Sequence, residues 1–217
     1  MKRRFFNFGA VALLAVHGAL GVPAVAGAQT GPRIAAQTEK RIVHEPGVPI
    51  LGAAAADVTV IEYFDYNCPF CKALAPAFQP FLAQDHAAAV LYKEWPIFGG
   101  ASIYAAQAAL AANYQGKYLQ AHDALISGPR LGQNSDVDAA LQRAGIDMVQ
   151  LRKDLVEHRA SIDALLKRND TEARGLGLHG TPGIVVGRRI VSGIDDLHAL
   201  QSAVAISRHA KQAQPGH

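Results

Sequence analysis

A pair of cysteines that closely follows a run of strand-forming residues limits which folds this chain can adopt. Cys68 and Cys71 are the only cysteines among 217 residues, and they lie three positions apart. The preceding segment, 58–64, is β-branched and aromatic, which is typical of a buried strand. A helix pattern continues from about 71 to 84, interrupted by Pro76 and Pro80. We therefore expect the pair at the start of a helix, one turn apart.

The remaining pattern alternates strands with helices. We expect a first edge strand near 48–51, a strong strand over 90–95, and a helical block at about 102–176. Two short strands should follow, over 184–186 and 189–191, and then a last helix that Asp195 would cap. Outside the block the pieces form a β-α-β half and a β-β-α half. This order predicts an α/β protein, with a thioredoxin-like fold and an inserted helical domain.

The first 28 residues have the pattern of a secretory signal peptide. Lys2, Arg3 and Arg4 precede an apolar stretch that ends in small residues, so cleavage is expected after about Ala28. A membrane anchor is the alternative, but glycines and a proline interrupt the stretch. We expect segment 29–50 to be a tether or short segment and 51–217 to be the folded domain.

The signal segment also explains the net charge. The chain holds 21 Lys+Arg against 18 Asp+Glu, a formal charge of +3. Lys2, Arg3 and Arg4 carry that whole excess, so the charges balance in the remainder. No basic run remains there, and we expect no nucleic-acid partner.

A Cys-x-x-Cys pair at a helix start favours thiol redox chemistry. The free N–H groups of the first turn and the helix dipole stabilise a thiolate on Cys68, whose sulfur we expect to be exposed. Thiols placed in this way have pKa values of roughly 3.5–7.5. Cys71, one turn on and more buried, would resolve a mixed disulfide. Pro69 suits the first helical position. Phe70 cannot supply the positive charge of a histidine, so we expect a less stabilised thiolate and a less oxidising couple.

Two other interpretations of the cysteines are weaker. A structural zinc site needs about four ligands, and the chain has no second cysteine pair and no histidines at ligand spacing. A purely structural disulfide would close a very short loop and stabilise little. We expect no metal and no cofactor.

Three segments resemble DsbA-like thiol:disulfide interchange proteins, in a branch that includes ScsC-like proteins with a CPFC or CPYC motif. They are 60–72, which contains the cysteine motif, 93–99 (Lys-Glu-Trp-Pro-Ile-Phe-Gly) and 179–187 (His-Gly-Thr-Pro-Gly-Ile-Val-Val-Gly). The segments stand in the family's order and spacing and cover about 48–205. The resemblance implies a thioredoxin fold and a periplasmic location.

The resemblance also implies roles for three further residues. Pro182 matches a cis-proline that lies beside the disulfide and helps to hold substrate backbone. Thr181 matches a position that tunes redox potential and substrate release. Glu62 matches a buried acid with a raised pKa that could relay a proton to or from Cys71. Residues 93–94 could supply a partner for it. An ordinary turn at 181–183 and a solvent-facing Glu62 are the alternatives.

The expected function is that of a periplasmic enzyme, a thiol–disulfide oxidoreductase that forms or exchanges disulfides in exported proteins. Its partners would be reduced or misoxidised exported proteins and a membrane redox partner, DsbB-like for an oxidase. A disulfide isomerase or reductase, kept reduced by a DsbD-like partner, is one alternative. A copper-binding stress protein that uses both thiolates is another. We expect a monomer, with an oligomer possible through 29–51.

Overall fold

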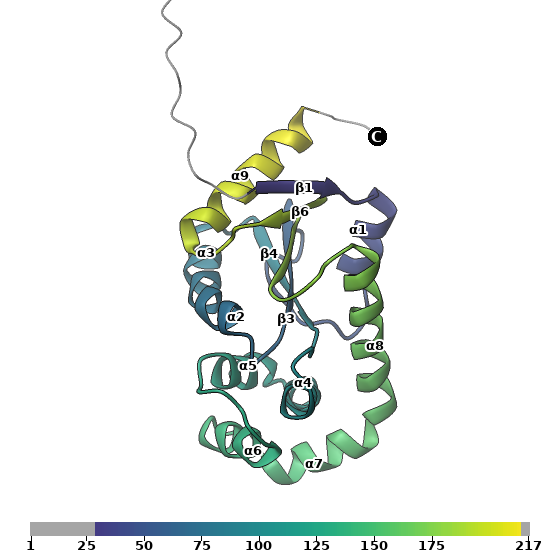
Figure 1. Ribbon diagram of the computed structural model, residues 1–217, viewed down its shortest axis with the longest axis vertical. Coiled ribbons are helices and arrows are strands. Elements are labelled where there is room, and N and C mark those ends of the chain that lie inside the picture. The colour runs from purple at the N-terminus through teal and green to yellow at the C-terminus, as the bar shows by residue number, and fades with distance from the viewer. Residues whose placement is uncertain (1–28, 214–217) are drawn as a thin grey trace, which may run out of the picture.

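A six-stranded sheet with helices on both faces organises residues 29–213, the part of the chain that the computed structural model describes (Figure 1). The expected signal peptide, 1–28, lies outside the described residues. The strands are β1 (Gln29–Arg33), β2 (Ile50–Gly52), β3 (Val58–Phe64), β4 (Ala88–Glu94), β5 (Gly183–Val186) and β6 (Arg189–Ser192). Their order in the sheet is β1-β6-β5-β3-β4-β2. Only β3 and β4 are parallel neighbours among these strands.

Helices lie between β1 and β2, between β3 and β4, between β4 and β5, and after β6. They are α1 (Ala36–Val43), α2 (Pro69–Leu74), α3 (Phe78–Gln84), α4 (Gly100–Ala112), α5 (Tyr118–Ile126), α6 (Asn134–Arg143), α7 (Met148–Glu157), α8 (Arg159–Gly175) and α9 (Leu197–Gln212). Helices α4–α8 form the predicted helical insertion, which confirms the expected fold class. The interruption expected at Pro76 is a 3₁₀ turn over Ala75–Ala77, because Pro76 lacks the N–H that a continuous helix needs, whereas Pro80 lies in the first turn of α3 and does not break it.

The cap of the last helix differs from the prediction by one residue. Asp196, not Asp195, is the N-cap of α9, and its side chain accepts a hydrogen bond from the Ala199 N–H at 2.8 Å. The backbone of Asp196 is extended, as an N-cap requires. Within 29–213, no helix combines the length and the apolar character needed to cross a membrane.

Segment 29–50 takes part in the fold. β1 pairs antiparallel with β6, and α1 follows it. Ile34 and Ile42, only 7% and 0% exposed, fix this segment against the sheet. The edge strand expected near 48–51 is β2, at Ile50–Gly52.

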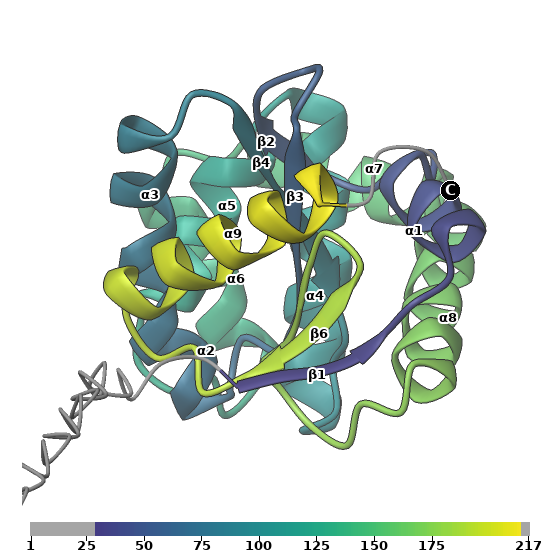
Figure 2. The same cartoon turned by 90° about the horizontal axis from the view of Figure 1, so that it is seen from above.

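The sheet separates two apolar cores. Successive residues of β3 point to opposite faces, so Val60 and Phe64 join one core while Ile61 and Tyr63 join the other. Every residue of β3 is buried, because helices cover both faces. Figure 2 shows α2, α3 and α9 on one side of the sheet and α1 with α8 on the other.

Candidate active site

The two cysteines lie where β3 ends and α2 begins, as the sequence predicts. Cys68 is the N-cap residue of α2 and has extended backbone angles, with Pro69 in the first helical turn. Cys71 is fully buried in the core beneath. Cys68 itself is only 1% exposed, so the expectation of an exposed sulfur is wrong for this conformation. The cause is contact with the segment before β5: Cys68 Sγ lies 3.1 Å from the Thr181 carbonyl oxygen.

The two thiols have opposite electrostatic environments. A hydrogen bond with Cys71 is the largest influence on Cys68, and Thr181 with the backbone N–H groups of Phe70 and Cys71 acts in the same direction. Together they outweigh burial and lower the pKa of Cys68 to about 6. Burial, above all, raises the pKa of Cys71 far above its ordinary value. At neutral pH, Cys68 is therefore the thiolate and Cys71 the thiol.

Glu62 is the buried acid that the resemblance implies. It lies on β3 between Tyr92 of β4 and Ile184 of β5, and it is 3% exposed, so the solvent-facing alternative is wrong. Burial, and then the negative charge of Cys68, raise the pKa of Glu62 from 4.5 to about 8. The charge of Glu62 in turn raises the pKa of Cys71. The acid is thus electrostatically coupled to both sulfurs.

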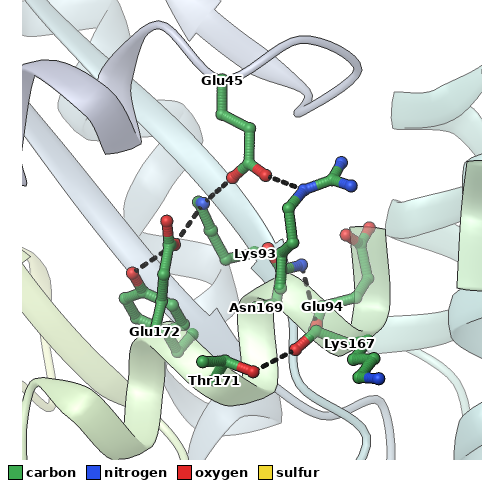
Figure 3. A network of polar contacts seen from close by, with 9 residues as sticks. Glu45, Lys93, Glu94, Lys167, Asn169, Thr171 and Glu172 are labelled. Carbon is green, nitrogen blue, oxygen red and sulfur yellow. Dashed lines mark hydrogen bonds and ion pairs between the residues drawn. The ribbon is translucent and has the colours of Figure 1, made fainter. Parts of the chain in front are cut away.

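Neither candidate partner of Glu62 at positions 93–94 pairs with it. Figure 3 shows Lys93 between Glu45 and Glu172, with the Lys93–Glu172 contact at 2.5 Å. Glu94 instead accepts a hydrogen bond from the Tyr118 hydroxyl at 2.5 Å. For Lys93 the reason is strand alternation: Lys93 points to the sheet face that carries α1 and α8, whereas Glu62 points to the opposite face, which carries the cysteines.

The segment before β5 brings a proline to the cysteines. The Thr181–Pro182 peptide bond is cis, as the resemblance implies. Strands β3 and β5 are antiparallel, and Tyr63 near the end of β3 pairs with Gly183 at the start of β5. The loop that precedes β5 and contains Pro182 therefore lies next to the loop that follows β3 and contains Cys68, at the same end of these two strands.

Two polar side chains of the loop before Cys68 were missed by sequence reasoning. Asp65 accepts hydrogen bonds from the N–H groups of Asn67 and Phe98, at 2.7 and 2.9 Å, and from the Ser102 hydroxyl at 2.7 Å. The Asn67 side chain donates to Ser102 and to the Leu131 carbonyl and accepts from the Leu131 N–H. Asp-x-Asn is a local turn signal, but its long-range partners leave no trace in the sequence. These bonds fix the cysteine loop to the helical insertion.

Lys72 makes a second link from the cysteine helix to the insertion. Its ammonium group donates to three carbonyl oxygens at the end of α5, those of Leu125, Ile126 and Gly128, at 2.9–3.1 Å. The last carbonyls of a helix lack partners within the helix, so a lysine there satisfies them. The orientation of α2 relative to the insertion is fixed by these contacts.

His122, one of the scattered histidines, is a buried core residue. Burial lowers its pKa to about 3, so the ring is neutral, and its Nδ1 lies 3.2 Å from the Tyr66 hydroxyl. Within residues 29–213, no group of three or more His, Cys, Asp or Glu side chains is placed to hold a metal ion.

Three solved structures have similar folds. A thioredoxin-like oxidoreductase from Silicibacter pomeroyi is 36% identical, with a TM-score of 0.74, covering 78% of this chain and 97% of that one. The catalytic domain of Proteus mirabilis ScsC is 26% identical, with a TM-score of 0.70, covering 80% and 96%. A periplasmic thioredoxin-like protein from Salmonella enterica serovar Typhimurium is 24% identical, with a TM-score of 0.67, covering 82% and 99%.

A curated relative has a different overall size. The Na(+)/H(+) antiporter NhaA 3 of Salinispora tropica is 28% identical over 169 residues, which are 76% of this chain but 26% of the antiporter. The chain therefore spans about a quarter of the length of that relative.

The family assignment rests on most of the chain. The model of the DSBA-like thioredoxin domain matches residues 59–205, which include the cysteine pair, the helical insertion and the cis-proline segment. The chain therefore belongs to the DSBA-like thioredoxin domain family of thiol oxidoreductases, with Cys68 and Cys71 as its Cys-x-x-Cys pair.

Proposed function

We propose that this protein is a periplasmic thiol–disulfide oxidoreductase that forms or exchanges disulfides in exported proteins. The observation that carries the proposal is the difference between the pKa values of the two thiols. Cys68, at the helix start and beside the cis-proline segment, has a pKa of about 6, whereas burial raises the pKa of Cys71. A low pKa makes a thiol a good leaving group, which favours oxidation of a substrate.

The oxidising reaction starts from the Cys68–Cys71 disulfide. A substrate thiolate attacks Cys68 Sγ, forms a mixed disulfide, and releases Cys71 as a thiolate that takes up a proton. A second substrate thiolate then attacks the substrate sulfur of the mixed disulfide and releases Cys68 as a thiolate. Two electrons pass from the substrate dithiol to the protein, and the substrate gains its disulfide.

Glu62 is suited to provide the proton that Cys71 needs. Its pKa of about 8 keeps most of the carboxyl protonated at neutral pH, and it is buried on the same side of the sheet as the cysteines. In the reverse direction the ionised carboxylate would accept that proton. Thr181 and Pro182 would hold substrate backbone against Cys68, and Phe70, 72% exposed, would contact the substrate or tune the couple together with Pro69.

We also propose the partners and the location. Reduced or misoxidised exported proteins would be substrates, and a DsbB-like membrane protein would reoxidise the pair. The signal pattern in the sequence supports a periplasmic location. Residues 29–51 supply β1 and α1 to the protein's own fold, which supports a monomer rather than assembly through that segment.

The redox potential tests the direction of the reaction. Equilibration with glutathione buffers should give a potential well above that of structural disulfides; a value below about −300 mV would rule out an oxidase. A potential in that reducing range, with the pair reduced in cells, would instead assign the isomerase or reductase function and a DsbD-like partner. Tight stoichiometric binding of copper by the reduced protein would assign the copper-stress function.

Two serine variants test the roles of the sulfurs. With a disulfide-bonded substrate, Cys71→Ser should accumulate a mixed disulfide, because the Cys68 thiolate attacks the substrate disulfide and the Cys71 thiol that would release it is gone. Cys68→Ser should form none and should also lose the thiolate absorbance that titrates near pH 6 in the wild type. A Cys68→Ser variant that still oxidised reduced substrates would overturn the assignment.

A further inference from the structure

A large groove lies between α1 and α8. Its volume is about 1170 Å³, above the roughly 300–1,000 Å³ of most small-molecule sites. Both helices pack on the sheet face opposite the cysteines, so the groove is separate from the redox site. Its size suits a peptide segment better than a small ion.

Each wall of the groove is one face of a helix. On α1 the lining residues include Gln37, Lys40 and Arg41, at the spacing of one helical stripe. On α8 the stripe runs through Lys167 and Arg168. Both walls thus present a consecutive Lys-Arg pair to the same space.

The carboxylates of the groove are already engaged at its floor. Glu45 pairs with Lys93 and with Arg168, and Glu172 pairs with Lys93, whose side chain is fully buried (Figure 3). Tyr63 donates a further hydrogen bond to Glu172. These contacts satisfy both acids before any ligand arrives.

Three cations of the rim have no such partner. Within residues 29–213, no ion pair joins Lys40, Arg41 or Lys167 to a carboxylate. All three residues are exposed. Outside the expected signal segment the chain has as many acids as Lys and Arg, so a local excess of positive charge here is a property of the groove and not of the whole protein. Such a surface attracts a partner of the opposite sign.

We propose that the α1–α8 groove is a second docking site, which binds an acidic peptide segment of a partner protein. The ammonium and guanidinium groups of the two rims pair with Asp or Glu side chains of the segment, while the aliphatic stems and the floor contact its backbone. The site operates independently of the thiol chemistry, so a test of this site does not test the proposed function.

The test is a fluorescence anisotropy titration of the purified protein with a labelled peptide that alternates Glu and Ser. The acidic peptide should bind, and its analogue with Gln in place of Glu should bind at least about tenfold more weakly. Raising the salt from about 0.01 M to about 0.15 M should weaken binding, because the Debye length falls from about 30 Å to about 8 Å. Equal binding of both peptides would overturn the proposal.

A pair of charge-matched variants locates the site. Lys40→Glu with Lys167→Glu reverses one cation on each wall and should weaken binding by about tenfold or more. Arg143→Glu with Lys153→Glu makes the same change in net charge at exposed positions on α6 and α7, outside the groove, and should bind like the wild type. Equal losses in both variants would show that net charge alone attracts the peptide and would overturn the site.

Two further measurements complete the test. Both variants should keep wild-type equilibration with glutathione, because the groove lies on the opposite face of the sheet from Cys68. Light scattering should show the same mass for all three proteins. A dimer that dissociates only in the Lys40→Glu, Lys167→Glu variant would assign the groove to a second copy of the chain and overturn the proposal.

Discussion

Replacing Glu62 with glutamine should stabilise the protein at neutral pH. Glutamine keeps the shape of the side chain but cannot ionise. In the folded protein the pKa of Glu62 is raised from 4.5 to about 8, chiefly by burial, so the unfolded chain loses this proton at a lower pH than the folded chain does. Stability from this group is therefore complete below pH 4.5 and is lost as the pH rises toward 8. Between pH 4.5 and the folded-state pKa, each pH unit costs about 1.36 kcal/mol. At about pH 7 the wild type is therefore less stable than Glu62→Gln by about 3 kcal/mol.

Urea unfolding of wild type and Glu62→Gln at about pH 4 and about pH 7 measures this difference. The fluorescence of Trp95, the single tryptophan, can report the transition. The exposed Glu157→Gln is the matched control and should change little at either pH. The gain should be smaller in the disulfide form, because the charge of Cys68 is the second cause of the shift. A gain that is absent at pH 7, or that is equally large at pH 4, would refute the argument.

Three other substitutions follow from the same contacts. Phe70→His should place a cation beside Cys68 and lower its thiol pKa below about 6, which ultraviolet titration of the thiolate measures; an unchanged midpoint would contradict this. Lys93→Met should lower the free energy of unfolding by about 3–5 kcal/mol, because it leaves the largely buried Glu172 without a cation and Glu45 with Arg168 alone, and urea unfolding will show whether the loss is that large. Asn67→Ala should cost about 1–3 kcal/mol by the same assay, because the backbone N–H and C=O of Leu131 lose a buried partner.

The main strands and the insertion could be predicted because their signals are local. Segment 58–64 is mostly β-branched or aromatic, 90–95 contains Val90, Tyr92 and Trp95, and the helical block is rich in good helix formers, so period and composition agree. β1 gives no such signal: its sequence, Gln-Thr-Gly-Pro-Arg, contains two residues that disfavour strands. It forms because β6 offers an open edge, which is a property of the assembled sheet.

The candidate site also has features that could be predicted from the sequence and features that could not. Cys68 and Cys71 follow from their spacing, and the places of Glu62 and Pro182 follow from the family resemblance. The near-complete burial of Cys68 did not follow, because it depends on a loop more than a hundred residues further along the chain. Strand register, which decides that Lys93 and Glu62 point to opposite faces, also became visible only in the structure.

The sheet and the insertion contribute to the site in different ways. The groups that act on the sulfurs come from β3, the loop after β3, α2 or the loop before β5, all outside the insertion. The insertion contributes Ser102 and Leu131, which hold Asp65 and Asn67, and the end of α5, which binds Lys72. A substitution in the insertion should therefore change the chemistry only by shifting the position of Cys68 and its helix. The pKa of Cys68 depends on hydrogen bonds that lengthen when its loop moves, so that pKa is the most direct measure of how tightly the insertion holds the site.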